Sequence, residues 1–540
     1  MISTRTLAAA AVTTALALAG TALTGTAAQA HPHGSTRLTP RTHFEMLPDG
    51  SSGRTAGGEG IPNIDSVKKT IYAYYGDPGT GIADKTSSPY ISEMDKIVKK
   101  ATRALKPAYD TAVRHGKKPA IVLDADDTTL ETYDMEVAGM KFNFTPAVQD
   151  VYVQGQKFPA TPAMVDFVTR AADIGYTIFG LTGRNDDQKA ATLANLAKVG
   201  YTDFSADRFY TKWTGAGSSQ QPPYISCATA KCTTVEYKAG TRKHIEELGY
   251  DISLNVGDQW SDLQGGYADK TLKLPNPTYY LPSANLPGVS EPWLSPRTHF
   301  EMKADGSSGL KGDGEGIPNI DSVKSTIYAY ANDPGTGIAD KTASPYIDEM
   351  SRLTRKVAPE ILAKCYLGAR LHKKPAIVLD ADDTTLWTYD MEVAGMHFDF
   401  TPAVQDVYVQ AQNFAATPSM VTLVNAAEDA GCTVIGLTGR SDDQKAATVA
   451  NLAKVGYTGF DAANYYTKWT GTGSSQQPSY ISCATAKCTT VEYKAGTRKH
   501  IESRAGGGYT IVGNFGDQYS DLAGGHGKAY KLPNPTYYLP

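Results

Sequence analysis

At each of two places in the chain, three carboxylates lie within four residues. The first cluster is Asp124, Asp126 and Asp127, and the second is Asp380, Asp382 and Asp383. Carboxylates this close together repel one another, and a bound metal ion would relieve the repulsion. Residues two apart on an extended segment share a face, so Asp124 and Asp126 can converge on one ligand. A phosphate group carried on the metal would complete a reaction site at this position.

The segment before each carboxylate cluster predicts how the cluster is positioned. Pro119–Leu123 and Pro375–Leu379 are apolar runs bounded by proline and by acid. Such a run is typical of a buried strand in a parallel sheet, and ligands of these sheets lie beyond the carboxyl ends of the strands. We therefore expect both clusters at the carboxyl edge of a sheet.

The sequence after the first cluster alternates between strand and helix patterns. Tyr176–Leu181 predicts a second strand, which ends at Thr182. Asp186 or Asp187 then caps a predicted helix that runs to about Val199.

The alternation continues towards the end of the copy. A helix is expected to begin near Ala239, directly after Lys238, and Ile252–Val256 predicts a third strand before Asp258 and Asp262. Every candidate polar group thus falls where a strand ends or a helix begins. The pattern predicts a doubly wound α/β fold, in which helices flank a parallel sheet with one active edge.

The chain consists of two copies of one long sequence repeat. Arg41–Met46 recurs as Arg297–Met302, and both copies end in Leu-Pro-Asn-Pro-Thr-Tyr-Tyr-Leu-Pro, at Leu274–Pro282 and at Leu532–Pro540. A repeat this long indicates two whole domains, since solenoid repeats run to roughly 20–50 residues. We predict a first domain over residues 41–282, a proline-rich linker over residues 283–296 and a second domain over residues 297–540.

Residues 1–30 are predicted to be a secretory signal peptide. Arg5 supplies a basic start, an Ala/Leu-rich run follows, and Ala28–Ala30 is an A-x-A pattern, so cleavage is expected near Ala30. Thr and Gly interrupt the run, which argues against a membrane anchor, and no later apolar stretch is long enough to span a bilayer. We expect a secreted protein with no membrane partner after cleavage.

The six cysteines agree with an oxidising compartment. Cys227 and Cys232 recur in the second copy as Cys483 and Cys488. We expect each pair to close a small loop by a disulfide, and a zinc site is the alternative.

The other two cysteines replace tyrosines. Cys365 and Cys432 stand where the first copy has Tyr109 and Tyr176. The simplest explanation is that these two positions touch, so that the second copy carries an extra bridge.

The charge of the chain excludes one class of partner. The formal net charge is −4 over 540 residues, and the sequence has no block of basic residues. Proteins that bind nucleic acids or anionic membrane surfaces do so through clustered Lys and Arg. We therefore expect no nucleic acid partner.

The chain resembles the haloacid dehalogenase (HAD)-like superfamily in the order of its motifs. Within that superfamily, it resembles the acid phosphatases of the plant vegetative-storage and bacterial class B/C type, subfamily IIIB. The resemblance rests on D-x-D-x-T at Asp124–Thr128, a strand that ends in Thr182, the lysine Lys238, and G-D-x-x-x-D at Gly257–Asp262. Both copies have these motifs in the same order. The resemblance implies two tandem Rossmann-like α/β domains with a minimal cap, and a Mg²⁺-dependent acid phosphatase.

The resemblance also implies roles for the acidic residues. Asp124 would be the nucleophile that becomes phosphorylated, and Asp126 would be the general acid and then the general base. The ligands of Mg²⁺ would be the Asp124 carboxylate, the Asp126 backbone carbonyl and Asp258. Asp262 would close the metal shell or hold a water.

Further residues would bind the phosphoryl group. Thr182 and Lys238 are implied to hold its oxygens, with Lys243 as a rival for the lysine. Arg184 and Arg440 would contact the substrate phosphate or form a surface salt bridge. The implied site of the second copy consists of Asp380, Asp382, Thr438, Lys494, Asp517 and Asp521.

Two other interpretations of the motifs fit less well. A calcium loop of the EF-hand type needs Gly and Glu where the chain has Thr129 and Met135. Arg114–Pro119 looks like the signature of histidine acid phosphatases, but the second copy has Leu371 in place of the histidine. We exclude the first interpretation and do not favour the second.

The short intervals between the motifs leave little room for a lid, which predicts an open cleft for small phosphomonoester substrates. Trp387 replaces Glu131 and Tyr519 replaces Trp260 in the second copy, so the two pockets are expected to differ. Two alternatives stay open: a storage or binding protein with weak phosphatase activity, and a phosphotransferase that uses an alcohol instead of water.

Overall fold

The structure is a computed structural model that describes residues 52–55, 57–58, 60–215, 220–282, 284–291, 308–311, 316–471 and 475–539. The predicted signal peptide, residues 1–30, lies outside the described residues, as do parts of the predicted linker. Within the described ranges, no helix is both long enough and apolar enough to cross a membrane.

The chain divides into two compact units. One consists of Val67–Val323 and is called the N-unit here, and the other combines the residues up to Ser66 with Lys324–Pro540 and is called the C-unit. The boundaries between the units fall inside two helices, α3 (Ile64–Tyr75) and α11 (Ile320–Tyr330). The predicted domain bounds at residues 41–282 and 297–540 stay a prediction.

The N-unit is built on a five-stranded sheet with the order β3-β2-β1-β4-β5. Every neighbouring pair is parallel. The predicted α/β fold with a parallel sheet is therefore confirmed. The strands are β1 (Pro119–Leu123), β2 (Thr177–Asn185), β3 (Phe209–Trp213), β4 (Asp251–Gly257) and β5 (Thr271–Lys273).

The C-unit repeats this sheet in the order β10-β9-β6-β11-β12, again with every pair parallel. Its strands are β6 (Pro375–Leu379), β9 (Thr433–Ser441), β10 (Tyr465–Trp469), β11 (Thr510–Gly516) and β12 (Ala529–Lys531). A separate antiparallel pair joins β7 (Leu386–Trp387) to β8 (Ala415–Ala416).

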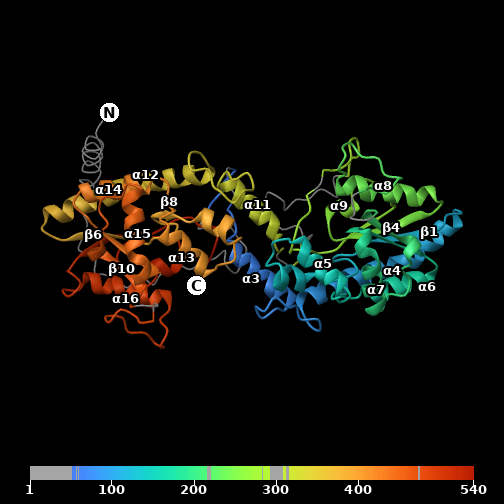
Figure 1. The fold of residues 1–540 in the computed structure, drawn as a ribbon, viewed down its shortest axis with the longest axis horizontal. Coiled ribbons are helices and arrows are strands. Elements are labelled where there is room, and N and C mark those ends of the chain that lie inside the picture. Colours follow the sequence, from blue (N-terminus) through green and yellow to red (C-terminus); the bar gives the residue numbers. More distant parts are fainter. Residues whose placement is uncertain are drawn as a thin grey trace. The chain divides into compact units, whose positions relative to one another are not determined.

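Helices cover both faces of each sheet, because strands buried on both faces carry apolar side chains on both. Besides α3, the N-unit helices are α4 (Pro89–Arg114), α5 (Pro146–Gln154), α6 (Met164–Ile174), α7 (Asp186–Lys198), α8 (Thr234–Glu247) and α9 (Trp260–Leu263). Ala120 and Val122 of β1 pack in one core with Tyr237 and Ile245 of α8. Figure 1 shows α8 on one side of this sheet and α4 and α6 on the other.

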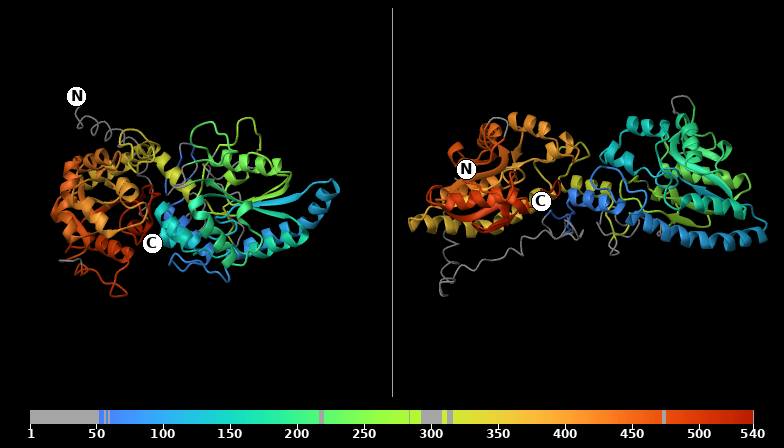
Figure 2. Two further views of the ribbon diagram at one scale, coloured as in Figure 1. Left: turned by 45° about the vertical axis from the view of Figure 1, so that its right-hand side comes forward. Right: turned by 90° about the horizontal axis from the view of Figure 1, so that it is seen from below.

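The C-unit has the same layers. Its helices besides α11 are α12 (Pro345–Arg370), α13 (Pro402–Gln410), α14 (Met420–Asp429), α15 (Asp442–Lys454), α16 (Thr490–Glu502) and α17 (Tyr519–Leu522). Ala376 and Val378 of β6 pack with Tyr493 and Ile501 of α16. Figure 2 shows the sheets and their helices from two further directions.

The cysteines form three disulfides, between Cys227 and Cys232, between Cys365 and Cys432, and between Cys483 and Cys488. In the N-unit, the rings of Tyr109 and Tyr176 lie 5.1 Å apart between centroids. The two positions at which cysteines replace tyrosines therefore touch in both units, as the paired substitution predicts.

Two predicted helix starts are wrong. Helix α8 begins at Thr234 and not near Ala239, because Thr233 and Glu236 form a reciprocal capping box. Helix α7 is capped by Asn185, whose side chain accepts a hydrogen bond from the Gln188 N–H, and not by Asp186 or Asp187. The two aspartates lie instead in the first turn, where negative charge is favourable.

Candidate metal centre

The carboxyl ends of two adjacent strands bring three acidic residues together in each unit. Asp124 follows β1, Asp258 follows β4, and Asp262 lies in the short helix α9. One ligand atom from each of the three lies within 4.8 Å of the others, and all three residues are buried. Asp380, Asp517 and Asp521 form the same group in the C-unit.

A buried lysine partly neutralises this group. The Lys238 Nζ lies 2.8 Å from Asp124 Oδ1 and 2.7 Å from Asp262 Oδ1. Burial alone would lower the pKa of the Lys238 ammonium, but the two carboxylates outweigh it and the pKa is raised. Lys243 is instead exposed near Glu247, so Lys238 is the lysine at the carboxylates. Lys494 pairs in the same way with Asp380 and Asp521, at 2.6 and 2.8 Å.

The carboxylates outnumber the cation that faces them. Burial, followed by the charge of Asp262, raises the pKa of Asp258 to about 6. Burial likewise raises the pKa of Asp124. A divalent cation would compensate this excess of negative charge, and a donor set made only of carboxylate oxygens fits a hard cation such as Mg²⁺. The group therefore fits the metal that the family resemblance implies.

Asp126 lies beside an arginine. Arg184 donates from Nη2 to Asp126 Oδ1 at 2.5 Å and from Nε to Asp126 Oδ2 at 3.2 Å, and Arg440 donates likewise to Asp382 at 2.6 and 3.3 Å. Both arginine side chains are buried. The sequence left open a salt bridge at the surface for these arginines, and the observed ion pairs are not of that kind. A buried bidentate arginine fixes the orientation of the carboxylate that it binds.

The predicted phosphate ligand Thr182 is fully buried in β2. Its Oγ1 accepts a hydrogen bond from the Arg184 N–H at 3.3 Å, and Thr438 accepts one from Arg440 at 3.2 Å. A role for either hydroxyl in phosphate binding stays a prediction.

One residue that sequence reasoning missed, Asn276, binds the carboxylates directly. Asn276 Nδ2 donates to Asp258 Oδ2 at 2.8 Å and to Asp127 Oδ2 at 3.3 Å. Asp127 is buried, with a φ of 49°, and also accepts a hydrogen bond from the Thr132 N–H at 2.9 Å. The repeated tail, in which the asparagine stands between two prolines, was the available signal for Asn276.

A buried arginine was also missed. Arg242 donates to the backbone oxygens of Asp262 at 2.6 Å and Gly266 at 2.9 Å, and also to that of Gln264. Burial lowers the pKa of Arg242 to about 10. These bonds hold the segment after α9, which carries Asp262.

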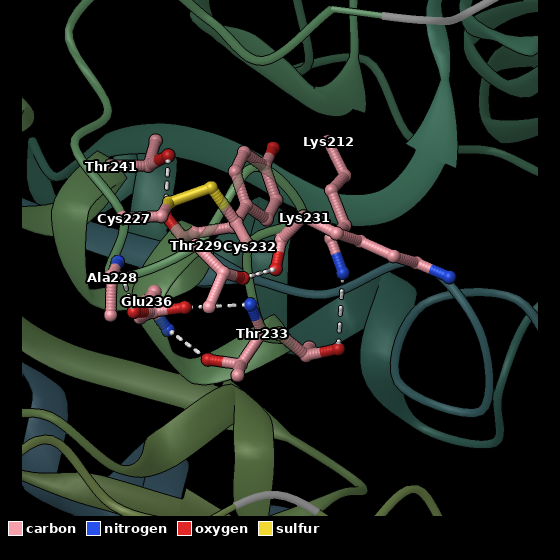
Figure 3. Close-up of a disulfide and its surroundings, with 11 residues drawn as sticks. Lys212, Cys227, Ala228, Thr229, Lys231, Cys232, Thr233, Glu236 and Thr241 are labelled. Carbon is pink, nitrogen blue, oxygen red and sulfur yellow. Dashed lines mark hydrogen bonds between the residues drawn. A yellow bond between two sulfur atoms is a disulfide. The ribbon is translucent and has the colours of Figure 1, made fainter.

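The disulfide between Cys227 and Cys232 lies directly before the helix that carries Lys238. Figure 3 shows Glu236 accepting hydrogen bonds from the N–H groups of Ala228, at 2.9 Å, and Thr233, at 2.7 Å. The Glu236 side chain therefore ties the disulfide loop to the first turn of α8.

The parallel sheets and the buried carboxylates at their carboxyl edges define an α/β protein with two candidate cation sites. The family model described as HAD superfamily, subfamily IIIB (acid phosphatase), matches residues 81–282 and 339–540. These two matches cover well over half of the sequence, so the chain belongs to this family.

The chain is similar to several known proteins. It is 34% identical over 185 residues to the stem 28 kDa glycoprotein of Glycine max, and this alignment covers 33% of this chain and 66% of that protein. It is 34% identical over 109 residues to acid phosphatase 1 of Solanum lycopersicum, and this alignment covers 20% of this chain and 37% of that protein. The solved class C acid phosphatase from Bacillus anthracis matches at 22% identity with a TM-score of 0.29, over 40% of this chain and 86% of that chain.

The matched regions are parts of the relatives. They span 66%, 56% and 61% of three stem glycoproteins of Glycine max.

Proposed function

We propose that each unit hydrolyses small phosphomonoesters through a phosphorylated aspartate, Asp124 in the N-unit and Asp380 in the C-unit. The observation that carries the proposal is the group of three buried carboxylates within 4.8 Å of one another, with a buried lysine beside it. Membership of an acid phosphatase family supports the same activity.

In this proposal, the carboxylates of Asp124 and Asp258 and the backbone carbonyl of Asp126 would hold Mg²⁺, and Asp262 would close the metal shell or hold a water. The bound ion would supply charge neutralisation for the phosphoryl oxygens. Lys238 offsets the negative charge of Asp124 and Asp262 and, with Thr182, binds the oxygens of the phosphoryl group. Asp380, Asp382, Asp517, Asp521, Lys494 and Thr438 have the same roles in the C-unit.

The reaction then proceeds in two steps. The Asp124 carboxylate attacks phosphorus, an oxygen–phosphorus bond to Asp124 forms, and the bond to the leaving alkoxide breaks while Asp126 gives that alkoxide a proton. Asp126 next takes a proton from a water, whose oxygen attacks phosphorus and releases phosphate and the free Asp124 carboxylate. Arg184 keeps the Asp126 carboxylate oriented for both transfers.

The test is phosphate release from a chromogenic monoester, with and without Mg²⁺, by the wild type, Asp124→Asn, Asp380→Asn and the double variant. We expect partial loss in each single variant and near-complete loss in the double variant, because each change removes one nucleophile. The matched control is His115→Ala, which is expected to keep full activity because His115 belongs only to the histidine-phosphatase pattern. Full activity in the double variant would refute the mechanism.

A storage role with weak activity is a second candidate, because vegetative storage protein 1 of Arabidopsis thaliana is 46% identical to the chain over 54 residues. Wild-type turnover barely above that of the double variant would favour it. Phosphotransfer is distinguished in the same assay by adding an alcohol and measuring its phosphorylated product. We further propose that the protein is secreted after cleavage near Ala30, which N-terminal sequencing of the exported protein tests.

A further inference from the structure

The C-unit contains a short segment from the first sequence copy, residues 60–66, which we call the first arm. Asn63 in this arm is buried, and its Nδ2 donates to the backbone oxygens of Tyr537 at 2.7 Å and Asn534 at 3.2 Å. The Ile64 N–H donates to the Pro535 oxygen at 2.9 Å. The first arm is thus bound to residues 532–539, the second tail, which belongs to the other sequence copy.

The N-unit contains the reciprocal segment, residues 316–323, which we call the second arm. Asn319 Nδ2 donates to the backbone oxygens of Tyr279 at 2.7 Å and Asn276 at 3.0 Å. The Ile320 N–H donates to the Pro277 oxygen at 2.9 Å. The second arm is bound to residues 274–282, the first tail.

The sequences of the arms and tails do not select these partners. Both arms read Ile-Pro-Asn-Ile-Asp, and both tails contain Pro-Asn-Pro-Thr-Tyr-Tyr. Each arm would therefore find the same hydrogen-bond partners on the tail of its own copy. The helices α3 and α11 continue each arm across a unit boundary, so that each arm belongs to a different unit from the rest of its own copy.

Contacts further upstream repeat the exchange. The Arg54 N–H donates to Glu349 Oε2 in the C-unit at 2.8 Å, and Tyr330 Oη donates to the same oxygen at 2.7 Å. In the N-unit, the Leu310 N–H and Tyr74 Oη both donate to Glu93 Oε2, at 2.8 and 2.7 Å. The residues upstream of each arm are therefore also bound to the other copy.

The tails connect the arms to the metal centres. The backbone oxygen of Asn534 accepts from Asn63, while the side chain of Asn534 donates to Asp517 Oδ2 at 2.8 Å and to Asp383 Oδ2 at 3.2 Å. One residue of the second tail thus lies between the first arm and a carboxylate of the C-unit centre. Asn276 has the same position between Asn319 and Asp258.

We propose that the two copies exchange their N-terminal arms, and that each arm positions the metal centre of the other copy through the tail asparagine. The arm is an interaction element whose partner is a second copy of the same sequence. Asn63 and Asn319 are positioning residues in this arrangement. The tandem repeat then forms one functional assembly, because neither centre is fully supported by its own copy alone.

Cross-linking of the full chain tests the exchange without reference to activity. Asp65 Oδ2 accepts from the Tyr538 N–H at 3.0 Å, and Asp321 Oδ2 accepts from the Tyr280 N–H at 3.1 Å. Cysteines introduced as Asp65→Cys with Tyr538→Cys are treated with a short bis-maleimide, and a protease site inserted within residues 292–307 is then cut. We expect the two fragments to remain joined.

The matched control pairs Asp65→Cys with Tyr280→Cys, the equivalent position on the tail of the same copy. We expect no bridge from this pair in peptide mapping, which is the readout here because both cysteines lie in the same fragment after cutting. A bridge in the control pair would overturn the proposal. A bridge of the first pair that forms only between separate molecules would also overturn it.

A second test concerns the metal and rests on the proposed function. In an Asp124→Asn background, only the C-unit centre is expected to turn over substrate. Asn63→Ala should then raise the Mg²⁺ concentration for half-maximal activity by roughly three- to tenfold. This shift is smaller than the one expected when a direct hydrogen-bond partner of a metal ligand is removed. In an Asp380→Asn background the same change should leave this concentration unaltered, and Asn319→Ala should show the opposite pattern. Equal effects in both backgrounds would overturn the positioning role. An inactive wild type would refute the proposed function and leave the cross-linking result to decide the exchange.

Discussion

Replacing Cys365 and Cys432 by tyrosine tests what the extra disulfide contributes, with a control that the chain itself contains. Tyr109 and Tyr176 occupy the same positions in the N-unit, where their ring centroids lie 5.1 Å apart. The double variant Cys365→Tyr with Cys432→Tyr therefore replaces the covalent bond by a side-chain contact that this fold accommodates.

The expected magnitude follows from the loop that the bond closes. Its cysteines are 67 residues apart in sequence. In the chain-entropy account, a loop of that length lowers the entropy of the unfolded chain by about 15 cal/mol/K, which corresponds to about 4 kcal/mol at 25 °C. The aromatic contact returns about 1 kcal/mol. We expect the free energy of unfolding of the C-unit to fall by about 3 kcal/mol.

Hydrogen exchange with mass spectrometry measures this change for each unit separately. Amides of β6 and β9 in the C-unit should exchange roughly a hundredfold faster in the variant, since about 1.4 kcal/mol corresponds to a factor of ten in an equilibrium constant. Amides of β1 and β2 in the N-unit serve as the internal control. A loss below about 1 kcal/mol would refute the reasoning, because the bond would then not restrict the unfolded chain. The reverse variant, Tyr109→Cys with Tyr176→Cys, should stabilise the N-unit.

Three further predictions concern the metal centre. In an Asp380→Asn background, Lys238→Met should lower the rate of phosphate release by a factor of about 10²–10³, because the buried carboxylates lose the ammonium group that faces them. The exposed control Lys243→Met should change the rate little. Equal losses in the two variants would contradict the assignment of Lys238 as the lysine of the site. Asn276→Leu should weaken Mg²⁺ binding by about 10- to 100-fold, and an unchanged Mg²⁺ titration would show that this asparagine does not hold Asp258. Removing metal with a chelator should lower the thermal midpoint, and Mg²⁺ at about a hundredfold its dissociation constant should restore about 2.7 kcal/mol; a midpoint unaffected by Mg²⁺ would count against a metal at this position.

The sequence predicted the elements that place the acidic residues at the sheet edge. Pro119–Leu123 is an apolar run of strand length, and the structure gives that segment as β1 with the same bounds. Asp124 and Asp258 follow two strands that are neighbours in the sheet, so the rule that parallel strands present ligand groups at their carboxyl ends was sufficient to bring them together. The paired change from tyrosines to cysteines likewise revealed a tertiary contact, because one chain contained both versions.

Other features of the site depend on patterns other than hydrophobic periodicity. The capping box of Thr233 and Glu236 fixes where α8 begins, and its pattern is local. Lys238 consequently lies inside the helix, where its long side chain reaches Asp124 and Asp262. Asn276 lies in an irregular tail, for which hydrophobic periodicity gives no prediction.

The sheet, the carboxylates at its edge and the existence of two copies could all be inferred from the amino-acid sequence, because each follows from patterns only a few residues long or from direct repetition. Which tail each arm binds could be learned only from the folded chain. Asn63 and Asn319 stand in identical local sequences and have chemically identical partners on either tail. Asn63 is bonded to the second tail and Asn319 to the first, and contacts between residues so far apart in sequence depend on the folded chain and not on the local sequence.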